Sequence, residues 1–286
     1  MRRWRELATK TAKQAARTRA ALGIDPTFSV CPFDIAGQLG LVVRLAAVAS
    51  LEGMYSPGPR RTVVLGTERP WGRIRHTCGH EIGHDVFGHG TRVDELCEGP
   101  RRAWSPEEYL ADRFSTGLLM PKLAVADALR RRGWEARTLT TVQVFTLAQD
   151  FGVGYSSFVS HAEGTLKIIP SFVADELRRQ GRRLGPVRNA VAGMPVAEDV
   201  FVVDEHWGAR PLDLETGDVV VIPPGALFSG RCARLSHDPA AHLVAVDAGE
   251  GQLRLRRRRS AINVRVSRRG FTGLARYRYL AEAEDE

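Results

Sequence analysis

Hydrophobic positions in the first part of the chain recur with the period of an α-helix, and two short runs rich in valine and leucine interrupt them. Residues 1–22 have apolar side chains at helical spacing, and Pro32 is suited to open a second helix. The runs 41–51 and 62–65 predict two strands, with a turn at residues 56–59 between them. We therefore expect the order helix, strand, strand before the next helical segment.

The middle of the chain continues with helical patterns. Helices are predicted at residues 107–119, 123–131, 141–151, 155–162 and 171–180. The third and fourth of these are separated by a glycine-rich turn, which is the form of a helix-turn-helix. Such a pair either contacts DNA or packs against the rest of its domain, and the sequence leaves both readings open.

The pattern changes after the basic segment that ends near residue 183. Short valine-rich runs at 200–203, 219–222 and 243–247 are separated by proline and glycine turns, and apolar residues alternate with polar ones over 261–267. This part of the chain predicts a small β-barrel or sandwich. The fold class is therefore α+β, with domains at 1–170 and 186–286 and a basic helix or linker at 171–185.

Composition limits the class of protein. The 286 residues are 43% hydrophobic and 26% charged, which is typical of a globular chain long enough for two domains. The longest apolar stretch is interrupted by Arg44 and is too short to span a bilayer, so we expect no membrane association and a cytoplasmic location. The scattered cysteines form no Cys-x-x-Cys pair, which indicates free thiols rather than a disulfide framework.

Net charge suggests acidic partners. The chain carries a formal charge of +8, and the basic residues are concentrated in the first helix and in the run Arg254–Arg259. These surfaces either contact nucleic acid or simply face water, and a charged strand end also prevents edge-to-edge association of sheets.

The segment His80-Glu81-Ile82-Gly83-His84 carries the clearest chemistry. Residues four apart lie on one face of a helix, so both imidazoles can reach one metal ion while Glu81 points at a water molecule beside it. This arrangement is typical of a zinc hydrolase. Gly83 is unfavourable in a helix on stability alone, but it leaves room for a metal ion or a close neighbouring chain.

A catalytic zinc site needs a third protein ligand, and the downstream acidic residues are candidates. In the helix predicted at 107–119, Glu108 and Asp112 lie one turn apart, so that Glu108 can bind the metal while Asp112 orients a ligating histidine. Ser105-x-x-Glu108 is also the spacing of a capping box, in which Glu108 would turn back to the backbone of Ser105. Spacing alone does not decide between the two. The acidic candidates are Asp94, Glu95, Glu98, Glu107, Glu108 and Asp112.

Together, residues 75–89 and 108–121 resemble the ImmA/IrrE-type zinc metallopeptidases, in which a His-Glu-Leu-Gly-His helix is followed by a helix reading roughly Glu-x-x-Ala-Asn/Asp-x-Phe-Ala. The resemblance implies a zincin-like domain with His80, His84 and Glu108 as zinc ligands and Glu81 as the catalytic residue. It extends over about residues 1–170. Two departures are that Thr77-Cys78-Gly79 replaces the more usual Thr-Leu-Ala, and that Ser115 replaces an alanine.

In the mechanism expected for such a site, Glu81 accepts a proton from water and later passes it to the leaving amine. Cys78 either takes part in metal or redox chemistry or is a small buried residue. The run Thr62–Leu65 is either the sheet edge that binds an extended substrate or an ordinary core strand. Five side chains are candidates for stabilising the oxyanion, namely His89, Tyr109, Arg113, Tyr155 and His161.

We expect a zinc-dependent endopeptidase that cleaves a specific regulatory protein. The resemblance implies that this substrate is a helix-turn-helix repressor in prophage, mobile-element or stress-response control. The alternatives are a regulator without peptidase activity, which binds DNA or a partner and holds zinc as a structural or sensory ion, and a toxin-antitoxin component.

Overall fold

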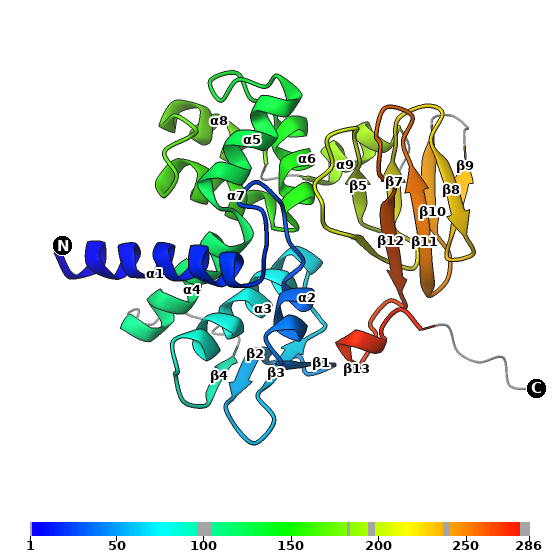
Figure 1. The fold of residues 1–286 in the computed structure, drawn as a ribbon. Coiled ribbons are helices and arrows are strands. Elements are labelled where there is room, and N and C mark those ends of the chain that lie inside the picture. The colour runs from blue at the N-terminus through cyan, green and yellow to red at the C-terminus, as the bar shows by residue number, and fades with distance from the viewer. Residues whose placement is uncertain (1, 96–104, 182–183, 194–197, 237–240, 281–286) are drawn as a thin grey trace, which may run out of the picture. The chain divides into compact units, whose positions relative to one another are not determined.

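The computed structural model describes residues 2–95, 105–181, 184–193, 198–236 and 241–280 (Figure 1). The chain forms two compact units, each of which combines segments distant in the sequence. Unit 1 comprises residues 1–125, 151–153 and 272–276, and unit 2 comprises residues 126–150, 154–271 and 277–286. Domain boundaries were predicted at residues 170 and 186. They refer to parts of the chain that fold independently, and they stay a prediction.

Unit 1 consists of a mixed sheet with helices packed against it. Its elements are α1 (Arg2–Ala21), α2 (Pro32–Gln38), β1 (Val42–Ala46), β2 (Leu51–Ser56), β3 (Thr62–Gly66), α3 (Trp71–Val86), β4 (Arg92–Glu95), α4 (Pro106–Leu119) and β13 (Gly273–Leu274). The strand order is β13-β1-β3-β2-β4, in which only the β1–β3 pair is parallel. Helix α3 packs against β2 and β3, α4 packs against α3, and α1 packs against α4.

The observed sheet corrects two predictions. The run 41–51 is not one strand, because β1 ends at Ala46 and an exposed turn separates it from β2. The predicted turn at 56–59 therefore joins β2 to β3. Thr62–Leu65 lies in β3, which is paired on both sides, so the prediction of a substrate-binding edge there was wrong and β4 occupies one edge of the sheet.

Helix α1 carries exposed basic side chains and one buried arginine that bonds to other segments of unit 1. Arg19 is buried and donates hydrogen bonds to the backbone oxygens of Leu118, Asp25 and Phe28. Burial lowers the pKa of Arg19 to about 10. Arg19 therefore joins α1 to the end of α4, and it does not belong to the basic surface expected for this helix.

Unit 2 contains most of the later helices and two four-stranded sheets. The helices after α4 are α5 (Lys122–Arg132), α6 (Thr141–Phe151), α7 (Tyr155–Gly164), α8 (Ser171–Gln180) and α9 (Leu184–Ala192). Helix α5 begins in unit 1, and most of the short 3-10 helix η1 (Ala275–Tyr277) belongs to unit 1. The strands are β5 (Val200–Val202), β6 (Leu212–Glu215), β7 (Val219–Val221), β8 (Leu227–Gly230), β9 (Ala233–Ser236), β10 (His242–Ala245), β11 (Gly249–Arg254) and β12 (Ile262–Ser267).

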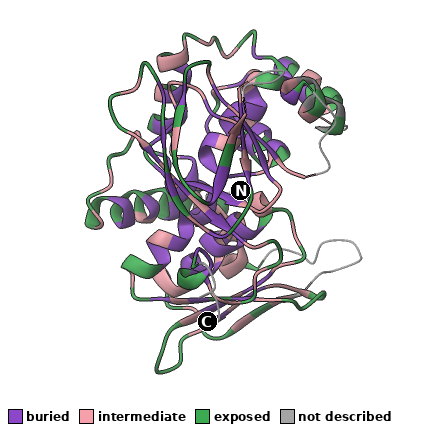
Figure 2. Cartoon of the chain, turned by 90° about the vertical axis from the view of Figure 1, so that its right-hand side faces the viewer, coloured by how far each residue is buried: buried purple, intermediate pink, exposed green. Residues whose placement is uncertain are grey.

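The two sheets of unit 2 share one hydrophobic core. Their strand orders are β5-β7-β10-β9 and β6-β12-β11-β8. Phe201, Val220 and Leu243 of the first sheet belong to the same buried cluster as Leu253 and Val264 of the second. Buried residues line the strands, while exposed residues concentrate on turns and outer helix faces (Figure 2). Of the two predicted forms the sandwich fits, since both sheets are open within the described residues.

A buried ionic cluster connects the helices of unit 2 to the loop before β6. Arg132 of α5 is ion-paired with Asp150 at 3.0 Å and with Asp204 at 2.7 Å, and the side chains of Arg132 and Asp150 are each 1% exposed. Asp150 also accepts a hydrogen bond from the backbone N–H of Gly208 at 2.8 Å. Among the described residues of both units, no helix is long and apolar enough to cross a membrane.

Replacing Asp150 by alanine is expected to destabilise the chain by about 3–5 kcal/mol, because Arg132 would remain buried without the one of its two charge partners that is itself fully buried. Urea unfolding followed by circular dichroism measures this change. The control is Asp127→Ala, which removes the partly exposed partner of Arg130 and should change stability by less than about 1 kcal/mol. Similar unfolding midpoints for the two variants would contradict a structural role for the cluster.

Candidate metal centre

Helix α3 presents the two histidines of the motif on one face. Its opposite side is anchored by Ile74, Cys78 and Ile82, which recur every four residues and are all buried. On the other face the Nε2 atoms of His80 and His84 lie 3.0 Å apart. The helical spacing therefore does bring both imidazoles to one point, as the sequence predicted.

Glu108 reaches the same point from α4. Its Oε2 atom lies 3.2 Å from Nε2 of His80, and its Oε1 atom lies 3.7 Å from Nε2 of His84. Ser105 caps α4, because its hydroxyl accepts a hydrogen bond from the backbone N–H of Glu108 at 3.1 Å. Ser105 therefore caps the helix, but the Glu108 carboxylate faces the histidines, as the ligand reading of the Ser105-x-x-Glu108 spacing requires.

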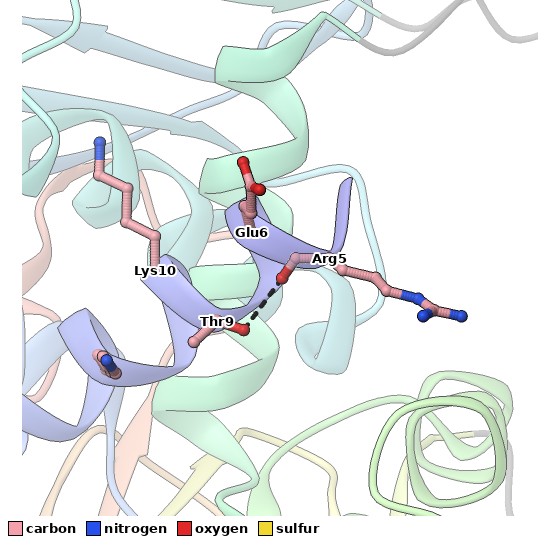
Figure 3. Close-up of a pocket in the computed structure, with 5 residues that line it drawn as sticks. Arg5, Glu6, Thr9 and Lys10 are labelled. Atoms are coloured by element: carbon pink, nitrogen blue, oxygen red, sulfur yellow. Dashed lines mark hydrogen bonds between the residues drawn. The ribbon is translucent and has the colours of Figure 1, made fainter. Parts of the chain in front are cut away.

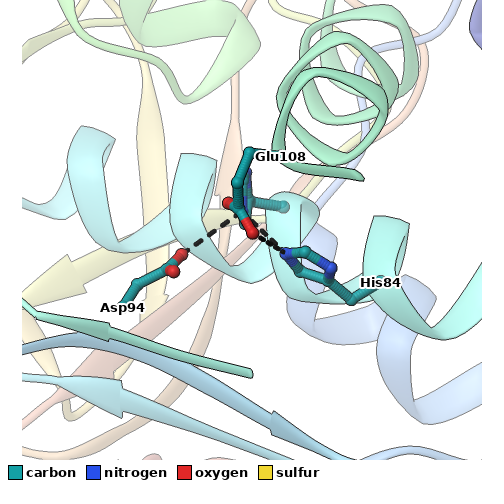
Figure 4. Close-up of side chains that lie close together, drawn as sticks. His84, Asp94 and Glu108 are labelled. Atoms are coloured by element: carbon teal, nitrogen blue, oxygen red, sulfur yellow. Dashed lines mark hydrogen bonds and ion pairs between the residues drawn. The ribbon is translucent and has the colours of Figure 1, made fainter. Parts of the chain in front are cut away.

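A second carboxylate enters from β4. The Oδ2 atom of Asp94 lies 3.2 Å from Nε2 of His80. One donor atom from each of His80, His84, Asp94 and Glu108 lies within 4.8 Å of the others, and Figure 4 shows Glu108 and Asp94 converging with His84. We call these four residues the donor cluster. The sequence offered Asp94 only as one acidic candidate among several, because the short strand β4 has no recognisable pattern.

Glycines on α3 allow α4 to come close enough to contribute Glu108. A Cβ atom added at Gly83 would lie 2.9 Å from Cα of Ala111, and one added at Gly79 would lie 2.6 Å from Oγ of Ser115. The Ser115 hydroxyl in turn donates a hydrogen bond to the backbone oxygen of His76 at 2.8 Å. Gly79 and Ser115, the two departures from the family pattern, therefore meet in one contact and compensate each other sterically.

Glu81 lies beneath the sheet, next to the donor cluster. It is fully buried, and neither of its carboxylate oxygens has a hydrogen-bond partner among the described residues. A Cβ atom added at Gly53 of β2 would lie 2.3 Å from Oε1 of Glu81, so only glycine leaves space for the carboxylate there. Burial raises the pKa of Glu81 to about 8, which indicates a proton acceptor suited to near-neutral pH.

The electrostatics of the cluster favour a positive charge at its centre. Burial alone would lower the pKa of His80, but Asp94 and Glu108 outweigh it and raise that pKa to about 10. Hydrogen bonds from His80 and His84 hold the pKa of Glu108 well below its usual range. Two imidazoles and two carboxylates that converge in this way can be neutralised by one divalent cation.

The donor set also fits zinc in type and spacing. Imidazole nitrogens and carboxylate oxygens are common zinc ligands, and bonds of about 2.0–2.1 Å in a tetrahedron place neighbouring donors about 3.3 Å apart. The contacts among His80, His84 and Glu108 range from 3.0 to 3.7 Å. The residues present are therefore compatible with a tetrahedral zinc ion, although their role as ligands stays a prediction.

The groups around the cluster differ in part from those predicted. The Nδ1 atom of His84 lies 2.8 Å from Nδ1 of His89, whereas Asp112 lies 3.8 Å from Nε2 of His76. Burial lowers the pKa of His89, which favours a neutral ring that shares one proton with His84. His89 thus contacts a histidine of the donor cluster, whereas Asp112 lies beside His76 outside it, and the orienting role of Asp112 stays a prediction.

The other residues predicted as candidates for stabilising the oxyanion lie in different surroundings. Tyr109 packs edge-on against Trp4 of α1 with ring centroids 4.7 Å apart, and the guanidinium of Arg113 lies 5.4 Å from the Tyr109 ring. Tyr155 and His161 belong to unit 2.

Cys78 is fully buried and is not part of the donor cluster, in keeping with a packing role. Cys31 and Cys232 are likewise buried and form no disulfide bond, whereas Cys97 and the acidic candidate Glu98 lie outside the described residues.

A shallow hollow of about 630 Å³ lies beside α1, and its lining residues differ from those of the donor cluster. It is lined by Arg5, Glu6, Thr9, Lys10 and Lys13. Figure 3 shows Arg5 and Lys10 extending away from the helix, while the Thr9 hydroxyl donates to the backbone oxygen of Arg5 at 3.0 Å. This surface offers mainly positive charge and no assembled set of catalytic groups, and none of the donor cluster lines it.

Comparison with known proteins supports a peptidase. Residues 36–161 match the family model Peptidase_M78, which is described as the IrrE N-terminal-like domain. This range contains the donor cluster and Glu81, and the match confirms the resemblance drawn from the two sequence motifs. No curated protein matched the chain.

The contact between α3 and α4 leads to a test by a double-mutant cycle. Gly79→Ala is expected to destabilise the chain by about 1–3 kcal/mol, because its Cβ would overlap the Ser115 hydroxyl. In the Ser115→Ala background the same change should be nearly neutral, since the hydroxyl is gone and alanine is favoured in helices. Free energies of unfolding in urea give the coupling, and strictly additive effects would show that the two departures are independent.

Proposed function

We propose that this chain, whose residues 36–161 belong to the IrrE N-terminal-like domain family, is a zinc-dependent endopeptidase of the zincin-like type. The observation that carries the proposal is the convergence of His80, His84 and Glu108 beside a buried Glu81 whose carboxylate has no partner among the described residues. Two helices that only pack against each other do not need a buried carboxylate without hydrogen-bond partners. They also do not need such a carboxylate beside a cluster of metal-binding side chains.

His80 and His84 of α3 and Glu108 of α4 would hold the ion. A bound Zn²⁺ supplies a Lewis acid that acidifies water and polarises a peptide carbonyl. Glu81 accepts the proton of the attacking water and then donates it to the amine that leaves when the peptide bond breaks. The buried position of Glu81 raises its pKa to about 8, so its proton affinity suits both steps.

The sheet of unit 1 supplies a place for an extended substrate. Strand β4 is an edge strand, paired antiparallel with β2, and Asp94 of β4 lies in the donor cluster. A peptide that adds to such an edge gains main-chain hydrogen bonds and passes close to the cluster. This role replaces the one first predicted for Thr62–Leu65.

The substrate class follows from the resemblance to ImmA/IrrE-type peptidases. We propose that the chain cleaves one regulatory protein, a helix-turn-helix repressor, in prophage, mobile-element or stress-response control, and that it acts in the cytoplasm. The exposed basic residues of α1 would then contact an acidic partner or DNA, whereas the α6–α7 pair has no Lys or Arg to contribute. Toxin-antitoxin membership stays a prediction without its own structural support.

A second function is favoured by one observation. Asp94 supplies a fourth donor, and four protein ligands are typical of structural rather than catalytic zinc sites. A regulator without peptidase activity that holds zinc as a structural or sensory ion would use the same residues. The two functions differ in their need for Glu81, which is adjacent to the cluster but is not one of its four donors.

Glu81→Gln is expected to keep its zinc but to lose about 10²–10⁴-fold in cleavage rate, because the amide cannot accept the proton of water. The readout is the appearance of new peptide N-termini in a cell extract, measured by mass spectrometry. Asp127→Asn is the matched control, since it neutralises a carboxylate on α5 that pairs with Arg130 and lies outside the donor cluster, and it should cleave like wild type. Equal cleavage by Glu81→Gln and wild type would reject the peptidase mechanism.

A further inference from the structure

We propose that Asp94 is a fourth protein ligand of the same metal ion, so that the folded site is a closed and latent form of the peptidase. This inference rests on the proposed function, since it concerns the zinc site described above. It assigns to strand β4 the control of access to the metal. The proposal depends on where Asp94 lies, on the charge it adds and on how β4 is held.

The position of Asp94 follows from strand register as well as from its side chain. Asp94 pairs with Gly53 of β2, and cross-strand partners project from the same face of a sheet. A side chain at Gly53 would point directly at Glu81 of α3. The register therefore directs the partly exposed Asp94 side chain toward the helix that carries the histidines.

Asp94 approaches His80 as closely as Glu108 does, although of the two only Glu108 also lies within 4 Å of His84. Each carboxylate has an oxygen 3.2 Å from Nε2 of His80, and both belong to the set of donor atoms that lie within 4.8 Å of one another. These separations are close to the edges of about 3.3 Å expected between neighbouring ligands of a tetrahedral zinc ion. With an ion bound between these donors, Asp94 would occupy the position that three-ligand catalytic sites leave to water.

Charge supports a fourth ligand. Two neutral imidazoles and two carboxylates would balance the charge of one divalent ion, whereas a site without Asp94 would keep a net positive charge. Glu81 brings a third carboxylate to the same small volume, fully buried and without a partner among the described residues. A divalent cation placed among these groups would lower the repulsion between them.

Strand β4 is held in a way that permits Asp94 to leave. It has four residues and lies at the edge of the sheet, where β2 is its partner in the described part of unit 1. Its pairing with β2 is irregular between Leu51 and Gly53, and its Arg92 forms an ion pair with Glu107 of α4. A short, irregularly paired edge strand can shift at lower cost than a central one. A protein substrate or partner that binds β4 would withdraw Asp94 and free a corner for water.

The test compares wild type with Asp94→Ala and with Asp94→Asn, which keeps the side-chain shape. Zinc affinity is measured by competition with a chelator, and Co²⁺-loaded protein is titrated with azide while its visible absorption is recorded. We expect both variants to bind zinc about 10-fold or more weakly than wild type, because a ligand is lost. We also expect azide to change the spectrum of the variants but not that of wild type, because only the variants have an open position.

Asp127→Ala is the control, since it removes a carboxylate on α5 that pairs with Arg130 and belongs to neither β4 nor the donor cluster, and it should match wild type in both measurements. The inference is overturned if both Asp94 variants bind zinc as tightly as wild type, or if wild-type cobalt already responds to azide. In either case the zinc peptidase itself survives, provided that wild type binds zinc and Glu81→Gln abolishes cleavage. Failure of wild type to bind zinc at all would instead reject the proposed function.

Discussion

The convergence of carboxylates and imidazoles between two helices and an edge strand is the constraint on which the rest of unit 1 depends. His80, His84, Glu108 and Asp94 place their donor atoms within 4.8 Å of one another, and Glu81 is buried beside them. Acidic groups this close repel one another unless protons or a cation lie between them. The arrangement is therefore best understood as one that a bound divalent ion completes.

Several local features of the sequence make sense only in relation to this point. Gly79 and Gly83 lack side chains where α4 crosses α3, and Gly53 lacks one where the Glu81 carboxylate lies under β2. Ser105 caps α4 through its hydroxyl, which leaves the Glu108 carboxylate available to the histidines. Each of the three glycines costs its helix or strand some stability, and each leaves space that a side chain would fill.

Sequence reasoning predicted the helices well because their apolar faces repeat over several turns, and the pairing of His80 with His84 follows from the same period. It missed β2 and β4, which are short and lack an alternating pattern, and with β4 it missed the place of Asp94. The edge role of Thr62–Leu65 was wrong because strand order is set by tertiary pairing. Likewise, the contact between His84 and His89 depends on how the chain turns after α3.

The central claim is that one zinc ion is held by α3 and α4 together. Metal content of purified wild type, His84→Ala and Glu108→Ala, measured by mass spectrometry of the elements after dialysis, tests it most directly. The account predicts about one zinc per chain in wild type and in the capping variant Ser105→Ala, with a large loss in the other two. Full zinc retention by folded Glu108→Ala would contradict it, because the third ligand would then come from elsewhere.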